Sequence, residues 1–302
     1  MELLPFANPG RFWKGNLHTH STRSDGTQPP QEVCRLYQQG GYDFIALTDH
    51  FLEQYGFPIT DTQPYRSAEF TTIIGAELHS GAIENGSVWH IVAAGLPFDF
   101  APPSAEESGA QLAARAMQAG AFVGIAHPHW YSLTAADVDA LGPAHAVEVY
   151  NGIAADANDR AESWHILDVL SDRRQRYFAY AADDAHLTDN YKDFRRGWVQ
   201  VKAEELSPEA LLTALKAGAF YSSTGPEIYD ITCVPGERLS VHCSPAERVF
   251  LTGVGSAAQR AWGNGLTSTE FDLSDWDSHY CRVTVRDQWG GKAWSNPIWL
   301  EE

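Results

Sequence analysis

The chain has 302 residues, of which 44% are hydrophobic and 20% are charged, a composition typical of a globular protein with a large core. Its formal net charge of −18 argues against nucleic-acid backbones and anionic membrane surfaces as partners, because both are bound through basic residues. The sequence shows no signal-peptide pattern and no apolar run of the roughly 20 residues that cross a bilayer, so we expect a cytoplasmic protein with a small-molecule substrate. The oligomeric state is left open.

Several short apolar runs in the first two-thirds of the chain end in polar residues. Runs of this length, rich in β-branched and aromatic residues, are typical of strands buried on both faces. They span residues 44–47 before His50, 72–76 before Glu77, 122–126 before His127, 146–150 before Asn151, and 177–182 before Asp184.

Helical segments are predicted between these runs, over residues 31–39, 105–119, 153–174 and 206–217. The last of these begins with Ser207 as N-cap and Pro208 at the first helical position. Strands that alternate with helices predict a parallel sheet, and this many units favour closure into a barrel. In such barrels the catalytic groups lie at the C-terminal ends of the strands, where the polar clusters occur.

The pattern changes after Pro226 to short alternating segments separated by turns, with no convincing helix. We therefore predict an α/β barrel over residues 1–225 and a small antiparallel β-sandwich over residues 226–302. His242 and His279 lie in the second domain and are interpreted as surface residues. The four cysteines (Cys34, Cys233, Cys243 and Cys281) have no C-x-x-C spacing and are interpreted as reduced thiols, with a bridge among the last three left open.

Histidines and carboxylates are concentrated at the predicted strand ends. In His18-Thr19-His20, residues two apart in an extended segment point to the same side, so both imidazoles can reach one ion. Asp25-Gly26 follows on a turn, although Asp-Gly is also an ordinary turn signal. Buried structural histidines do not explain so many on one rim, and imidazoles mixed with carboxylates indicate zinc, manganese or iron. One metal ion cannot coordinate all of the candidate ligands, so they predict a site for two or three metals. The candidate ligands are His18, His20, Asp25, His50, Glu77, His90, His127, Asp184 and His186.

The order of these motifs resembles the polymerase-and-histidinol-phosphatase (PHP) family. The matching segments are His18-x-His20, Thr48-Asp49-His50, Gly75-Ala76-Glu77, Ala126-His127-Pro128 and Asp184-Ala185-His186. The resemblance covers about residues 14–224 and implies a distorted barrel of about seven strands. The segments 221–226 and 293–299 look like the carbaryl-hydrolase-like branch, which has an appended β-domain.

The resemblance also implies a division of the ligands among three metals. One would be held by His18, His20, Glu77 and Asp184, a second by Asp25 and His50 with Glu77 bridging, and a third by His90, His127 and His186. The catalytic assignments are Asp184, Glu77 and His186. Some family members have histidine at the position of Asp25, and His90 matches its motif more loosely than the others.

Residues beside the motifs are assigned secondary roles. Glu148 and Asn151 end a strand at the same rim and are expected to orient ligands by hydrogen bonds. His79 is interpreted as a neighbour rather than a ligand, and Asp183 as structural. His129, Arg23 and Arg196, with Arg195 beside it, are candidates for substrate contacts, with surface solvation as the alternative.

The predicted activity is hydrolysis by a metal-bound hydroxide, with a small phosphate ester as the leading substrate class by family resemblance. The same chemistry acts on amides, carbamates and carboxylic esters, so these form the first alternative. The ten tryptophans leave a third hypothesis, a non-catalytic protein that binds metal or carbohydrate.

Overall fold

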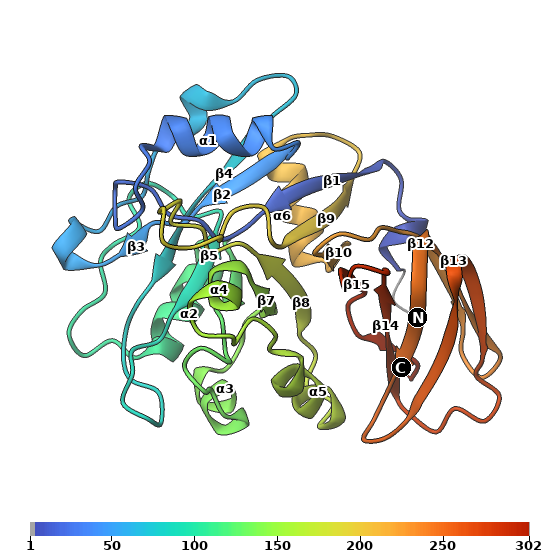
Figure 1. Ribbon diagram of the computed structural model, residues 1–302. Coiled ribbons are helices and arrows are strands. Elements are labelled where there is room, and N and C mark those ends of the chain that lie inside the picture. The colour runs from blue at the N-terminus through green and yellow to red at the C-terminus, as the bar shows by residue number, and fades with distance from the viewer. Residues whose placement is uncertain (1–3, 302) are drawn as a thin grey trace.

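The computed structural model describes residues 4–301, in which one continuous mixed sheet runs through the molecule with helices packed against it (Figure 1). The strands follow the order β11-β12-β14-β15-β10-β9-β1-β2-β4-β5-β6-β7-β8. The strands up to β10 are β1 (Arg11–Asn16), β2 (Phe44–Leu47), β3 (His50–Phe51), β4 (Thr71–Leu78), β5 (Ile91–Ala94), β6 (Phe122–Ile125), β7 (Ala146–Asn151), β8 (Phe178–Ala182), β9 (Trp198–Ala203) and β10 (Phe220–Ser223). The predicted buried runs are thus confirmed as β2, β4, β6, β7 and β8.

The sheet is mixed rather than parallel, which corrects the sequence prediction. β2 pairs in parallel with β1 and β4, and β7 pairs in parallel with β6 and β8. β5, however, is antiparallel to both β4 and β6, and β9 is antiparallel to β1 and β10. β5 follows β4 through a loop without a crossover helix, and such a loop suits an antiparallel pair.

Strands β10 and β8 lie at the two ends of the N-terminal part of the sheet, and one side chain joins them. Ser222 of β10 accepts a hydrogen bond from the amide of Ala181 in β8 at 2.9 Å and donates one to the carbonyl of Ala179 at 2.8 Å. The backbone pairing of the described residues ends at β8. The Ser222 hydroxyl therefore joins β8 to β10, as a further pair of backbone-bonded strands would in a closed barrel. The complete barrel stays a prediction.

The helices are α1 (Pro30–Gln39), α2 (Gly109–Gln118), α3 (Ala135–Leu141), α4 (Gly152–Ala157), α5 (Trp164–Asp172) and α6 (Pro208–Lys216), with short 3-10 turns η1 (Pro5–Ala7), η2 (Glu53–Tyr55) and η3 (Gln63–Tyr65). Serine N-caps decide two of the helix starts. Ser207 accepts from the amide of Ala210 as the N-cap of α6, as predicted. α2 begins later than expected because Ser108 forms a capping box with Gln111. α3 was not predicted. None of the helices within residues 4–301 combines the length and apolarity that crossing a membrane requires.

The single long helix predicted over residues 153–174 is wrong, because the chain forms α4 and α5 with a turn between them. Asp159 adopts a left-handed φ of 58°, and the side chain of Asn158 accepts a hydrogen bond from the amide of Arg160. Glu162 then forms a β-bridge with Tyr150, which brings the chain back to β7. The chain thus leaves β7 into α4 and returns to β7 before α5 begins, so the first residues of α4 lie beside the end of β7.

The C-terminal strands are β11 (Ile228–Val234), β12 (Arg238–Thr252), β13 (Ala258–Asp272), β14 (Tyr280–Arg286), β15 (Lys292–Trp294) and β16 (Ile298–Trp299). Their mutual pairings are all antiparallel, and they share one apolar core. β15 also pairs with β10, so backbone hydrogen bonds continue across the predicted boundary at residue 225. The boundary and the sandwich arrangement stay predictions.

Two sequence interpretations about this region are resolved. All four cysteines are free and buried, so no bridge forms among Cys233, Cys243 and Cys281. The interpretation of His279 as a surface residue is wrong. Its imidazole is buried, lies 2.9 Å from the carbonyl oxygen of Ser171 and stacks on Trp299.

Candidate metal centre

Three neighbouring strands bring histidines and a glutamate to one rim of the sheet. Glu77 lies near the end of β4, and His50 opens β3 as its direct parallel partner. His90 precedes β5, which is antiparallel to β4, so the start of β5 lies at the same rim as the end of β4. The antiparallel direction of β5 therefore explains why His90 comes before its strand, whereas Glu77 lies near the end of its own.

The His18-x-His20 and Asp184-x-His186 segments lie side by side and extend this rim. Thr19 and Ala185 form a parallel β-bridge. The amide of His20 donates to the carbonyl of Ala185, and the amide of Asp184 donates to the carbonyl of His18, both at 2.8 Å. Alternating residues of both segments consequently face the same space.

Two residues at the rim adopt left-handed backbone conformations, which residues other than glycine rarely adopt. His127 has a φ of 26° and Asp184 a φ of 52°. Such conformations cost on the order of 1–3 kcal/mol each and need firm support. The amide of His127 is held by the carboxylate of Glu148 at 2.7 Å, and the amide of Asp184 by His18. Strain held in place in this way is typical of functional sites.

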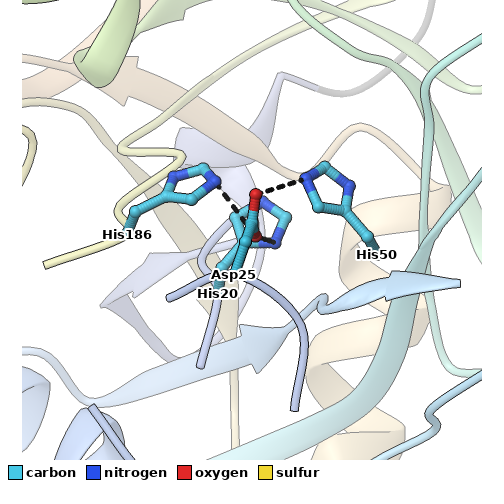
Figure 2. Close-up of side chains that lie close together, drawn as sticks. All are labelled: His20, Asp25, His50 and His186. Carbon is cyan, nitrogen blue, oxygen red and sulfur yellow. Dashed lines mark ion pairs between the residues drawn. The ribbon is translucent and has the colours of Figure 1, made fainter. Parts of the chain in front are cut away.

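Asp25 lies between histidine rings that come from distant parts of the chain (Figure 2). Its Oδ1 is 3.3 Å from Nε2 of His186 and 3.9 Å from Nδ1 of His20, and its Oδ2 is 3.4 Å from Nε2 of His50. One ligand atom from each of these four residues lies within 4.8 Å of the others. The group could therefore hold a metal ion.

Glu77 forms the centre of the next group. Its carboxylate oxygens lie 2.6 Å from Nδ1 of His50, 2.8 Å from Nδ1 of His90 and 3.6 Å from Nε2 of His79. Further ligand sets are formed by His18, His127 and Asp184, and by His18, His20 and Glu77. The sets share His18, His20, His50 and Glu77 and therefore form one continuous cluster. Its carboxylates Glu77 and Asp184 are buried.

The structure groups some ligands differently from the division that the resemblance implied. His90, His127 and His186 do not form a set. Instead His186 joins Asp25, His20 and His50, while His90 joins Glu77 and His127 joins His18 and Asp184. His79 lies inside the cluster, with Nε2 only 2.9 Å from Nδ1 of His50. Its proximity makes it a candidate ligand beside the residues predicted from the motifs.

Burial and charge act against each other in this cluster. Burial lowers the pKa of His20 to about 3, reinforced by neighbouring His186 and His50, and burial likewise lowers the pKa of His79 to about 3. Burial also disfavours charge on His50, yet the carboxylates of Glu77 and Asp25 raise its pKa to about 11. Burial opposes charge on Glu77 too, but the surrounding imidazoles hold its pKa well below the ordinary value. The site thus favours ionised carboxylates and neutral imidazoles at His20 and His79, the protonation states that bind divalent cations, whereas His50 must lose a proton before it can bind one.

Two buried atoms test whether a metal fits. His18 Nε2 and Glu77 Oε2 make no hydrogen bond within the described part of the chain. Both belong to the predicted ligand sets, and buried polar atoms are normally paired. A divalent cation coordinated by imidazole nitrogens and carboxylate oxygens would satisfy both atoms. The residues present therefore fit a metal centre of this kind.

Glu148 and Asn151 make the contacts expected of residues that orient ligands. Oε1 of Glu148 lies 3.0 Å from Nδ1 of His18, and its Oε2 accepts from the side chain of Asn151 at 2.9 Å. Asn151 also donates to Oδ2 of Asp184 at 3.1 Å and caps α4 through its own oxygen. These hydrogen bonds fix the orientation of ligands on two segments at once.

Two aspartates support the site from outside it. Asp183 points away from the cluster, as predicted, and accepts hydrogen bonds from the hydroxyl of Tyr37 and the amides of residues 195–197. Asp49 accepts from the amide of Ser21 at 2.7 Å and from the hydroxyl of Ser24 at 3.0 Å, so it braces the turn that carries Asp25. The sequence analysis assigned no role to Asp49, although it stands directly before His50 in the recognised Thr-Asp-His segment.

A cavity of about 280 Å³ opens onto the cluster. Five residues for which the sequence predicted no role line it beside the predicted ligands: the aromatic Trp130, Tyr131 and Tyr191, the apolar Ile153, and the polar Thr188. The ring of Tyr131 lies 4.7 Å from that of His90. Trp130 and Tyr131 follow the Ala-His-Pro segment in sequence, and this position was the only available signal for them.

The candidates for substrate contact lie elsewhere. His129 is exposed and lines a neighbouring cavity with Ser132 and His165. Arg23, Arg195 and Arg196 are exposed, and none of them lines the cavity at the cluster. Their contact with substrate stays a prediction.

Comparison with known proteins identifies the fold. No protein-family model and no curated protein matches the chain. A solved structure from Bacteroides vulgatus, described as a two-domain protein containing a predicted PHP-like metal-dependent phosphoesterase, is similar with a TM-score of 0.54 and 16% identity. The match covers 95% of this chain and 97% of that one, so the two proteins share a mixed α/β fold over their full lengths. An amidohydrolase from Chromobacterium violaceum has a TM-score of 0.43 and 16% identity over 59% of this chain and 89% of its own.

Proposed function

We propose that this protein is a metal-dependent hydrolase that acts on a small phosphate ester with two or three divalent cations, zinc, manganese or iron. The observation that carries the proposal is the continuous cluster of imidazoles and buried carboxylates at one rim of the sheet. The fold shared with a protein described as containing a predicted PHP-like phosphoesterase supports the phosphate ester as the leading substrate class.

Divalent cations at such a centre would polarise the bond to be broken and lower the pKa of a water molecule enough to supply hydroxide near neutral pH. The protein's own contribution is orientation. Nδ1 of His18 faces the carboxylate of Glu148, and Nδ1 of His186 faces the carbonyl oxygen of Asp184 at 3.0 Å. Both partners only accept hydrogen bonds, so in the neutral imidazoles that would bind cations each Nδ1 would carry the proton and each Nε2 would offer its lone pair.

The proposed catalytic residues are Asp184, Glu77 and His186. Asp184 and Glu77 are buried carboxylates that each contact two or more histidines, so each can bridge neighbouring cations. The side chain of His186 is partly exposed and lines the cavity, where it would meet substrate.

One observation favours the alternative of an amide, carbamate or carboxylic ester as substrate. No arginine or lysine lines the cavity among residues 4–301, whereas Trp130, Tyr131 and Tyr191 do. A phosphate is usually bound by such cations, and an uncharged aromatic substrate needs none. Placement in the carbaryl-hydrolase-like branch belongs with this alternative.

The experiment that decides between them is hydrolysis by manganese- or zinc-loaded protein of a p-nitrophenyl phosphomonoester, a phosphodiester and an aryl carbamate. We expect turnover of a phosphate ester that is lost in Asp184→Asn, while circular dichroism shows an intact fold. Carbamate turnover alone would establish the alternative. Equal activity of Asp184→Asn would refute the proposed site, and failure to turn over any of the three substrates would favour the third hypothesis of a non-catalytic binding protein.

A further inference from the structure

A second concave site lies in the C-terminal strands, where β12 and β13 lose their regular pairing. The register shifts twice between His242 and Arg248, and a groove of about 490 Å³ opens at this point. Its walls include Glu247 and Arg248 of β12, Trp262 and Asn264 of β13, and Gln288 and Trp289 of the turn between β14 and β15. Figure 1 places β12 and β13 at the opposite side of β14 and β15 from the strands that carry the metal cluster. The groove shares no residue with the cavity at the cluster.

Two tryptophans in this groove are unusually exposed. Trp262 is 64% exposed and Trp289 is 83% exposed, whereas indole rings are on average largely buried. Exposing large aromatic surface costs free energy in water, so two such rings in one concavity indicate a binding function.

Contacts hold the ring of Trp262 and the backbone turn that carries Trp289. Trp262 lies opposite Arg248 in the β12–β13 ladder, and the guanidinium carbons of Arg248 and Arg260 lie 5.6 and 5.4 Å from its ring centroid. Trp289 lies on a turn that Asp287 stabilises, since one carboxylate oxygen accepts from the amides of Trp289 and Gly291 at 2.9 and 2.8 Å. Gly290 in the same turn has a φ of 89°, which favours glycine. The rings are thus presented by rigid backbone, which limits the entropy that binding would cost.

The two charged residues that line the groove, Glu247 and Arg248, carry opposite charges. Glu247 lies 3.3 Å from Arg286 and 3.9 Å from Arg248, so these arginines are already paired with a carboxylate. Asn264 and Gln288 add amides that both donate and accept hydrogen bonds. Paired charges do not suit a phosphate or a nucleic acid, but flat apolar rings beside mixed donors and acceptors match the C–H faces and hydroxyls of sugars.

We propose that this groove binds an oligosaccharide, with sugar rings stacked on Trp262 and Trp289 and hydroxyls hydrogen-bonded to Asn264, Gln288 and Glu247. The site is separate from the metal cluster and does not depend on the hydrolase function. It gives the C-terminal strands a role of their own, which is to attach the protein to a glycan.

The test is native gel electrophoresis of the full chain in gels that contain soluble cellulose derivative, xylan, mannan or starch, followed by calorimetric titration with the matching hexasaccharide. We expect retardation by at least one polysaccharide. Trp262→Ala and Trp289→Ala should each weaken binding about tenfold or more, because aromatic anchors dominate such sites. Phe98→Ala is the matched control, since Phe98 is 51% exposed in the loop after β5 and its loss should leave binding unchanged.

Absence of retardation by all four polysaccharides would overturn the proposal, as would binding that survives both tryptophan substitutions. Sedimentation velocity of the wild type and of Trp262→Ala tests a second copy of the chain as the occupant. A concentration-dependent dimer that is lost in the variant would also overturn the proposal, in favour of self-association.

Discussion

Replacing Glu148 by glutamine should weaken metal binding without unfolding the protein. Glu148 is fully buried and accepts hydrogen bonds at both oxygens, from Nδ1 of His18 on one side and from the amides of His127 and Asn151 on the other. Glutamine keeps the shape but replaces one oxygen with a donor. If its oxygen stays on the side of His127, its NH₂ group faces Nδ1 of His18 and moves the imidazole proton to Nε2. Nε2 is the atom that faces Asp184 at 3.2 Å and Glu77 at 3.6 Å, and it can no longer bind a cation.

Loss of such an orienting partner costs about 10–100-fold in metal affinity, which corresponds to roughly 1.4–2.8 kcal/mol. The assay is a competition titration of metal-free protein with zinc or manganese against a chelator, with circular dichroism to verify the fold. Glu162→Gln is the matched control, since Glu162 pairs with Lys292 at the surface. Nitrogen-15 spectra of the imidazoles report the tautomer of His18 directly. Wild-type affinity in a folded Glu148→Gln protein would falsify the reasoning.

Three further predictions concern the whole protein. Saturating manganese or zinc at about a hundred times the dissociation constant should raise the free energy of unfolding by about 2.7 kcal/mol, and an unchanged urea midpoint with and without metal would contradict a metal centre. Asp183→Ala should lower the free energy of unfolding by about 2 kcal/mol or more, since it removes the acceptor of the Tyr37 hydroxyl and of three backbone amides, and urea titration measures this directly. The four cysteines should not react with Ellman's reagent in the native state and should all react in guanidinium. Burial raises the pKa of Cys34 to about 12 and of Cys233 and Cys243 to about 11, so rapid native labelling of any of them would show that these strands open.

The sequence by itself determined the buried strands and the residues that follow them. Runs such as 44–47 and 122–126 are apolar without interruption, and only a strand covered on both faces buries such a run. The polar residues at the strand ends were recognisable as candidate metal ligands because residue type and order along the chain are enough to indicate them. For the same reason the sequence located the Ser207 cap and the structural role of Asp183, while the orienting role of Glu148 stays a prediction.

Only the tertiary structure decided which candidate ligands lie close together. His186 lies with Asp25 rather than with His90 and His127, because the bridge between Thr19 and Ala185 places the Asp184 segment next to the His18 segment. That pairing joins residues more than 160 positions apart, and no local pattern encodes it. The direction of β5 was equally hidden, since an apolar run of four residues reads the same in either orientation. The groove of Trp262 and Trp289 depends on a turn and a register shift that meet only in the folded sheet. Local periodicity therefore specifies the elements and their chemistry, whereas long-range backbone pairing specifies which side chains meet.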